Sequence, residues 1–564
     1  MLDRVDSSLR DKTIAEVKDL RVEFQTKDGP VVGVSDVSFN IKSGETVCLV
    51  GESGSGKSVS SLSLMRLVEF GGGEITGGRL LFNRKDSDEI DLAKTDPNLM
   101  RSIRGNEIGM IFQEPMTALN PVFTVERQLT EGLRLHASLS RSAASARALE
   151  LMREVRIPEP ERRLKQYPHE LSGGMRQRVV IAMALACKPR LLIADEPTTA
   201  LDVTIQAEIL ALIDRLKRET GTAVMFITHD MAVVAQMADR VVVMFRGKKV
   251  EEGTVEEIFE NPQHLYTKAL LAAVPKLGEM SGKKYPEPMV LMSRQQSAAV
   301  PIKGTNELLL EVESLTTRFA VKGGMLRRKV ANVHAVEDVS FTINKGQTLG
   351  LVGESGCGKS TLAKALIYLD PPSQGSVSYN GKPIVQTTTS LRKLRKEIQF
   401  IFQDPYAALH PLKTIGSAIE EVLYVHGIAV SSKAQKERSH QLLYQVNLAP
   451  SFYNRYPHEL SGGQRQRAVI ARALATEPKL LICDESVAAL DISVQAQVLN
   501  LLNDLKKELG LSYLFISHDL AVVKYMSDRV MVMENGYLLE IQEADALYAT
   551  PKHPYTQKLI DAIP

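Results

Sequence analysis

The sequence predicts an α/β fold that occurs twice along one chain of 564 residues. The first observation is a glycine-rich motif present in two copies, Gly51–Ser58 and Gly353–Ser360. The second is the setting of each copy, which follows a short apolar run (Thr46–Val50 or Thr348–Val352) and precedes helix-forming sequence. Apolar runs of this kind are typical of buried parallel strands. The third is that further matching blocks follow both copies in the same order, which indicates a tandem duplication.

Both copies fit the phosphate-loop pattern G-x-x-x-x-G-K-[ST]. In such a loop the backbone N–H groups point at phosphate oxygens, with a helix N-terminus behind them. Lys57 and Lys359 would add charge near the β and γ phosphates, and the hydroxyls of Ser58 and Ser360 can ligate Mg²⁺. A chance glycine-rich turn is the alternative, and two copies inside a wider repeat exclude it. The other loop residues predicted to hold the nucleotide are Gly51, Ser53, Gly54, Gly56, Gly353, Ser355, Gly356 and Gly358.

Composition narrows the class of protein. Apolar residues make up 44% and charged residues 24%, as in ordinary globular proteins, and a net charge of +2 gives no broad basic surface for nucleic acid. We expect no membrane span, because no apolar run reaches about 18 residues, and no secretory signal. The four cysteines form no C-x-x-C pair, which suits a reducing cytoplasm and argues against a zinc or iron–sulfur site.

The repeat continues downstream with identical spacing in the two halves from Ser172 and Ser461 onward. Before those serines the first half is longer, and we place the surplus in a polar surface loop around residues 84–98. Each half closes with a predicted β-hairpin, for which Asn535-Gly536 is a strong turn signal. We predict one domain over residues 1–275, a polar linker over 276–307 and a second domain over 308–564.

The downstream blocks place polar side chains where strands end or helices begin. Ser172-Gly173-Gly174 and Ser461-Gly462-Gly463 read as helix N-caps with exposed N–H groups, a potential anion site. Carboxylates at the carboxyl end of a strand beside a phosphate loop can handle Mg²⁺ and water. The strand-end carboxylates, and the histidines that follow the next strand, are Asp195, Glu196, Asp484, Glu485, His229 and His518.

Each half contains, in this order, the phosphate loop, Gln113 or Gln403, the Leu-Ser-Gly-Gly block, the Asp-Glu strand end and the histidine. This set of motifs resembles that of an ABC-transporter ATPase. Glutamine segments such as Gln113–Pro121 and the His-x-Tyr-Thr tails narrow the resemblance to importers of peptides and nickel. Fusion of two copies into one chain is most similar to the ATP-binding proteins of glutathione importers. This resemblance implies two tandem P-loop NTPase domains, each with a mixed-sheet RecA-like core, an antiparallel β subdomain and a helical subdomain.

The resemblance also implies two composite ATP sites, formed head to tail between the halves. Site one would combine the first loop with Phe24 for adenine stacking, Gln113, Asp195, Glu196, His229 and the second signature, Ser461 to Gly463. Site two would combine the second loop with Phe319, Gln403, Asp484, Glu485, His518 and the first signature, Ser172 to Gly174. The aspartates and glutamines would ligate Mg²⁺ together with Ser58 and Ser360. The glutamates, the histidines and again the glutamines would act in hydrolysis. Phe24 and Phe319 could instead be core aromatics.

The function implied is ATP hydrolysis that drives import of glutathione or short peptides. The implied partners are two integral-membrane permease subunits and a periplasmic solute-binding protein, with the chain bound peripherally at the cytoplasmic face of the inner membrane. A soluble tandem ATPase acting on ribosomes or DNA is the alternative. Cys357 lies inside the second loop beside Lys359, so we expect thiolate character there and faster reaction with maleimide than at the other cysteines.

Overall fold

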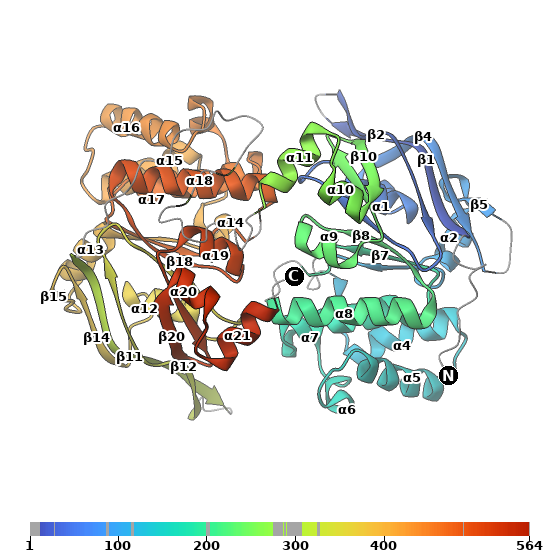
Figure 1. The fold of residues 1–564 in the computed structure, drawn as a ribbon, viewed down its shortest axis with the longest axis horizontal. Coiled ribbons are helices and arrows are strands. Elements are labelled where there is room, and N and C mark those ends of the chain that lie inside the picture. The colour runs from blue at the N-terminus through green and yellow to red at the C-terminus, as the bar shows by residue number, and fades with distance from the viewer. Residues whose placement is uncertain are drawn as a thin grey trace. The chain divides into compact units, whose positions relative to one another are not determined.

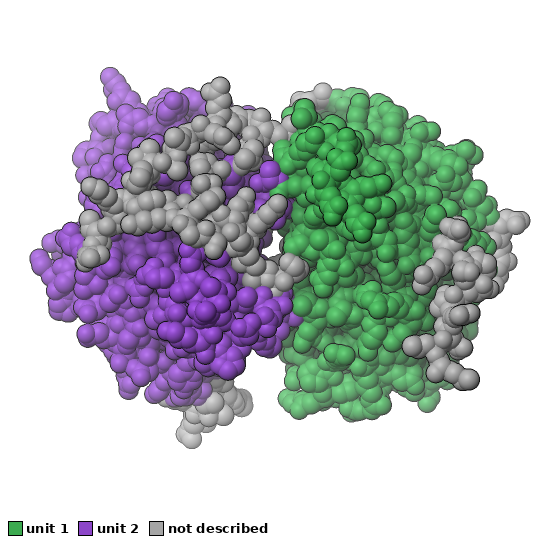
Figure 2. All heavy atoms as spheres, in the orientation of Figure 1, with its two compact units in different colours: residues 1–201, 205–271, 564 green, residues 202–204, 272–563 purple. Residues whose placement is uncertain are grey.

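A computed structural model describes residues 12–26, 29–85, 89–113, 118–198, 203–274, 286, 289, 307–323, 328–488 and 490–562. The chain divides into two compact units, one of residues 1–201, 205–271 and 564 and the other of residues 202–204 and 272–563 (Figure 2). Of the predicted linker, 276–307, only Pro286, Met289 and Glu307 are among the described residues.

The first unit contains an antiparallel sheet and a mixed sheet (Figure 1). The antiparallel sheet has the order β2-β1-β4-β5, from strands β1 (Thr13–Thr26), β2 (Gly29–Lys42), β4 (Gly73–Asn83) and β5 (Glu89–Asp91). The mixed sheet has the order β10-β9-β3-β8-β7-β6, from strands β3 (Thr46–Val50), β6 (Ile108–Ile111), β7 (Leu191–Asp195), β8 (Ala223–Ile227), β9 (Arg240–Phe245) and β10 (Lys248–Thr254). In the mixed sheet only the edge strand β10 is antiparallel to its neighbour.

Helices complete the first unit. Strand β3 is buried along its whole length and leads through the phosphate loop into α1, which confirms the predicted strand–loop–helix order. Helices α4, α5 and α7 pack on one another and form the helical part of the unit (Figure 1). The helices of the unit are α1 (Lys57–Leu64), α2 (Pro97–Ile103), α4 (Val125–His136), α5 (Arg141–Glu154), α6 (Pro160–Arg163), α7 (Gly173–Leu185), α8 (Val203–Thr220), α9 (Met231–Met237), α10 (Val255–Glu260) and α11 (Leu265–Ala272).

The second unit repeats this plan. Its antiparallel sheet, β12-β11-β14-β15, uses β11 (Leu308–Gly323), β12 (Arg328–Asn344), β14 (Gln374–Tyr379) and β15 (Lys382–Pro383). Its mixed sheet, β16-β17-β18-β13-β19-β20, uses β13 (Thr348–Val352), β16 (Ile398–Ile401), β17 (Leu480–Asp484), β18 (Ser512–Ile516), β19 (Arg529–Glu534) and β20 (Tyr537–Glu543). Its helices are α12 (Lys359–Leu366), α13 (Thr388–Glu397), α14 (Pro405–Ala408), α15 (Ile415–Val425), α16 (Ser432–Gln445), α17 (Gly462–Leu474), α18 (Ile492–Leu509), α19 (Leu520–Met526), α20 (Ala544–Ala549) and α21 (Pro554–Asp561).

The central strands of the second mixed sheet, β13, β17 and β18, are buried along their whole length because both of their faces are covered. In β17, Leu480 and Ile482 join a core with the antiparallel sheet and α12, whereas Leu481 and Cys483 join the core of the helical part. Successive side chains of a strand point to opposite faces, so one strand supplies two cores. This layering holds the carboxyl end of β17, and with it Asp484, at a fixed place beside the phosphate loop.

Two smaller expectations have different outcomes. The hairpin at Asn535-Gly536 is confirmed, because β19 and β20 pair antiparallel with Glu534 opposite Tyr537. The surface loop expected around residues 84–98 is wrong in part, since the stretch contains β5 and the first turn of α2. Asp96 accepts a hydrogen bond from the Asn98 N–H and caps α2, a local signal that composition alone does not reveal. None of the helices in the described parts of the chain is both long enough and apolar enough to cross a membrane.

Candidate active site

The phosphate loop of the first unit curls around the side chain of its own lysine. Lys57 is buried, and its ammonium group donates hydrogen bonds to the backbone oxygens of Gly51 at 2.6 Å and Glu52 at 2.9 Å. Gly56 precedes α1 with φ 98°, a left-handed conformation that favours glycine. A Cβ on Gly51 would lie 2.1 Å from the Met244 oxygen of β9, so only glycine fits there.

The strand-end carboxylates lie beside this loop. The Ser58 hydroxyl donates to Asp195 Oδ1 at 3.2 Å. Burial raises the pKa of Asp195 to about 6, although the Ser58 hydrogen bond opposes that shift. Glu196, the next residue, has φ 47°, a backbone conformation that costs free energy in a non-glycine residue and is often found at functional sites.

Glu196 is the centre of the first site. Gln113 Nε2 donates to its Oε2 at 2.8 Å, and His229 Nδ1 lies 3.1 Å from its Oε1. These three side chains come from segments far apart in the sequence: Gln113 follows β6, Glu196 follows β7 and His229 follows β8. Because β6, β7 and β8 are parallel neighbours, their carboxyl ends bring the three groups to one edge.

The second unit reproduces the cluster. Ser360 donates to Asp484 Oδ1 at 3.0 Å, and Gln403 Nε2 donates to Glu485 Oε2 at 2.7 Å. His518 Nδ1 lies farther from Glu485, at 3.8 Å. The pKa of Glu485 is lowered by His518, and burial raises the pKa of Asp484 despite the Ser360 hydrogen bond.

The two signature segments begin helices. Ser172 caps α7 and accepts from the Met175 N–H at 3.4 Å, and Ser461 caps α17 in the same way. A Cβ on Gly463 would lie 2.1 Å from Val494, so that position needs glycine. Among the described residues, the hydroxyls of both serines bond to their own helices and not to the phosphate loop of their half. Each unit therefore brings together the loop, the carboxylates, the glutamine and the histidine.

The two aromatic residues expected to stack on adenine differ in their surroundings. Phe24 is half-buried, and its ring packs on the backbone of Gly33 and Gly73. Phe319 is 41% exposed on β11. Gly33 also lies next to Gly56, so Phe24 stands near the phosphate loop.

The expectation for Cys357 is wrong. This residue is buried, and burial raises the pKa of its thiol although Lys359 Nζ lies 4.0 Å from the sulfur. The Lys359 ammonium group donates hydrogen bonds to the backbone oxygens of Gly353 and Glu354. Desolvation of the thiolate therefore has a larger effect on the pKa of the thiol than the positive charge has. Cys187 is the more accessible cysteine, since it alone among the four is half-buried.

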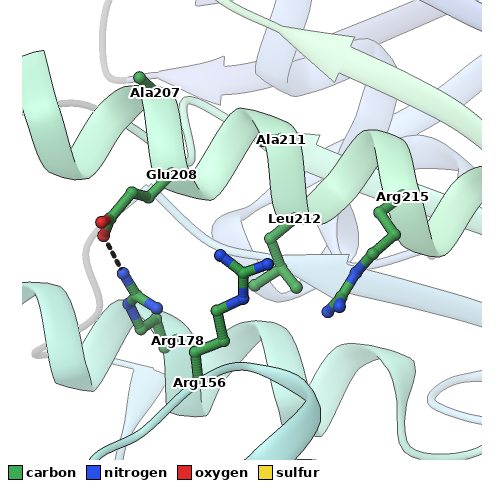
Figure 3. Close-up of a pocket in the computed structure, with 7 residues that line it drawn as sticks. All are labelled: Arg156, Arg178, Ala207, Glu208, Ala211, Leu212 and Arg215. Carbon is green, nitrogen blue, oxygen red and sulfur yellow. Dashed lines mark hydrogen bonds and ion pairs between the residues drawn. The ribbon is translucent and has the colours of Figure 1, made fainter.

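A groove of about 290 Å³ lies elsewhere on the first unit, between α7, α8 and the end of α5 (Figure 3). Arg178 pairs with Glu208 and donates to the Val155 oxygen, and Arg215 donates to the Glu154 oxygen. Two of the three arginines that line the groove therefore connect helices through hydrogen bonds. None of the predicted site residues lines the groove. Asn500 of the second unit corresponds in the repeat to Ala211 of this groove, which lies 289 residues earlier in the chain. The Asn500 side chain forms two 3.0 Å hydrogen bonds with the main chain of Met289.

Tyr266 and Tyr555 are site residues that the motif assignment missed. The Glu52 N–H of the first phosphate loop donates to the Tyr266 hydroxyl at 2.9 Å, and the Glu354 N–H donates to the Tyr555 hydroxyl at 3.0 Å. The His-x-Tyr-Thr block in both tails was the sequence signal for them, although it gave no indication of a contact with the loop.

Comparisons with known proteins identify families and relatives that the chain resembles. The model of the ABC transporter family matches residues 34–199 and 336–488, and that of the oligopeptide/dipeptide transporter C-terminal region matches 250–296 and 539–564. The chain is similar to the glutathione import ATP-binding protein GsiA of Pectobacterium atrosepticum (strain SCRI 1043), at 51% identity over 99% of this chain and 90% of the relative. It is equally similar to GsiA of Escherichia coli (strain K12), at 51% identity over 98% and 89% of the two chains.

A dimeric bacterial ABC transporter cassette of known structure is 30% identical, with a TM-score of 0.39, and covers 43% of this chain and 99% of its own. Neither family model concerns ribosomes or DNA, so the alternative of a soluble ATPase acting on them has no support.

Proposed function

The chain belongs to the ABC transporter family, as an ATP-binding protein with two ATPase domains, and on this premise we propose that it powers import of glutathione or short peptides. The relatives named for glutathione import support the solute class, because the similarity extends over nearly the whole chain. The oligopeptide/dipeptide transporter C-terminal region, present in both halves, supports an importer of peptide-like solutes.

The observation that carries the ATPase mechanism is the duplicated cluster centred on Glu196 and Glu485. Each carboxylate has the position and the partners to orient the attacking water and to accept its proton. His229 and His518 would hold the γ-phosphate and the water in line. Gln113 and Gln403 would leave their glutamates and turn to the γ-phosphate when ATP binds, so these loops would report hydrolysis.

The donor set also fits Mg²⁺, a hard cation that prefers oxygen ligands. In the first unit Ser58 and Asp195 already place a hydroxyl and a carboxylate within hydrogen-bond distance, and Ser360 and Asp484 do so in the second. The amide oxygens of Gln113 and Gln403 would complete the protein ligands. A bound Mg²⁺ would neutralise charge on the phosphate oxygens.

We further propose that each ATP lies between the loop of one half and the signature of the other. Exposed signature residues support this, because Ser172, Gly173, Ser461 and Gly462 are exposed to solvent at the start of α7 and α17. Phe24 and Phe319 would stack on the adenines. The domains would comprise residues 1–275 and 308–564, joined by the linker 276–307.

The proposed partners are two integral-membrane permease subunits and a periplasmic solute-binding protein, with this chain at the cytoplasmic face of the inner membrane. Affinity purification of the tagged full-length chain from detergent-solubilised membranes tests the assignment. Two integral-membrane proteins in stoichiometric amounts are expected. Recovery of the chain with ribosomes or DNA, and without permease subunits, would contradict it.

A further inference from the structure

The last helix of each unit contacts the phosphate loop of the same unit through a tyrosine hydroxyl. Glu52 donates its N–H to Tyr266 of α11, and Glu354 donates its N–H to Tyr555 of α21. Both tyrosines are buried, at 2% and 7% exposure, and the Tyr266 ring packs on Phe245 with a centroid distance of 4.3 Å. Because the same contact forms in both copies of the repeat, it is a feature that the two units share and not a peculiarity of one of them.

The His-x-Tyr-Thr block fixes the tyrosine in place. His264 Nδ1 accepts a hydrogen bond from the Tyr266 N–H at 3.2 Å, which caps the start of α11. The carboxylate of Glu251, in β10, accepts from the N–H groups of Gln263 at 2.6 Å and His264 at 3.1 Å. The second unit repeats each bond with His553, Tyr555, Glu540 and Lys552.

The tyrosine holds one peptide group of the loop from one side while the lysine holds it from the other. In the first unit the Glu52 N–H donates to the Tyr266 hydroxyl, and the oxygen of the same peptide group, that of Gly51, accepts from Lys57 at 2.6 Å. The hairpin turn before β10 adds a second anchor, because the Gly247 N–H donates to the Ser55 oxygen at 3.0 Å. In the second unit Gly536 donates to the Cys357 oxygen at the same distance.

We propose that Tyr266 and Tyr555 are positioning residues for nucleotide binding, through which each C-terminal helix sets the shape of the phosphate loop. The hydroxyl fixes the Glu52 or Glu354 peptide, so the N–H groups that follow are already directed at the phosphates before ATP arrives. Preorganisation of this kind increases affinity because less ordering remains to be done on binding. The proposal rests on the proposed ATPase function, and it assigns to the C-terminal region a control over nucleotide affinity.

Removal of one hydroxyl in the second unit tests the proposal. In the full-length chain, Lys57→Ala would confine nucleotide to the second loop, and binding of a fluorescent ATP analogue with Mg²⁺ would be titrated. Tyr555→Phe keeps the ring and removes the acceptor of the Glu354 N–H. A buried hydrogen bond corresponds to a change of roughly two- to tenfold in an equilibrium constant, so we expect the Kd to rise by about that factor.

Tyr513→Phe is the matched control, because Tyr513 is also buried in the second unit and donates to a backbone oxygen, that of Leu502 at 2.9 Å. It should lower the melting temperature comparably and leave the Kd unchanged. Equal Kd values for Tyr555→Phe and its parent, or equal rises in both tyrosine variants, would overturn the positioning role. Failure of the Lys57→Ala parent itself to bind nucleotide would instead overturn the proposed function. The mirror experiment, Tyr266→Phe with Lys359→Ala, repeats the test in the first unit if Tyr555→Phe does not fold.

Discussion

Asp195→Asn should make the nucleotide-free protein more stable at alkaline pH while it removes a ligand of the proposed Mg²⁺ site. Burial raises the pKa of Asp195 from 3.8 to about 6. A carboxyl group with a raised pKa favours folding below pH 3.8, and that contribution is lost as the pH rises through about 6. At 1.36 kcal/mol for each pH unit, the ionised carboxylate costs roughly 3 kcal/mol at pH 8. The asparagine remains neutral, keeps a hydrogen-bond acceptor for Ser58 and avoids this cost.

Calorimetric melting of the full-length chain in EDTA, without nucleotide, measures the effect. The transition of the first unit should rise by about 5–10 °C at pH 8 and by roughly half as much at pH 5. Asp214→Asn is the control, because Asp214 pairs with Arg218 at the surface, where ion pairs contribute about 0–1 kcal/mol. If Asp195→Asn melts below the wild type at pH 8, the account of a buried, unneutralised carboxylate is wrong.

Three further predictions follow from the site. Glu196→Gln combined with Glu485→Gln should keep ATP binding and lower kcat by about 10²–10⁴, since the amide cannot accept a proton; hydrolysis near the wild-type rate would refute the assignment. Ser461→Arg should block nucleotide trapping at the site of Lys57 and spare the other site, and loss confined to the other site would refute head-to-tail pairing. Maleimide should label Cys187 before the three buried cysteines, as peptide mapping would show; first labelling within the phosphate loop would contradict the burial.

Sequence patterns predicted the α/β repeat because its motifs depend on local geometry. A phosphate loop needs a strand before it and a helix behind it, and both Lys57 and Lys359 stand at that junction. The Asp-Glu pairs were predictable in the same way, as the ends of apolar strands. The relation of Gln113 and His229 to Glu196 came only from the family resemblance, because it depends on the order of strands in the sheet.

Long-range contacts and burial were not predictable. Tyr266 is 214 residues from Glu52, and no pattern in either segment states that they meet. Cys357 was misjudged because sequence adjacency to Lys359 suggested a stabilised thiolate, whereas the lysine is engaged with backbone oxygens and the thiol is desolvated. Tertiary packing, and not the neighbours in the chain, decides both cases: it brings Tyr266 to Glu52, and it buries the thiol of Cys357.

Uptake of labelled glutathione and of a labelled dipeptide tests the central claim most directly. The measurement would use cells that express this chain with its permease and binding-protein partners, and would compare the wild type with the Glu196→Gln, Glu485→Gln double variant. The account predicts uptake of one of these solutes with the wild-type chain and background uptake with the double variant. Equal uptake with both chains would contradict the claim that ATP hydrolysis at these two sites drives import.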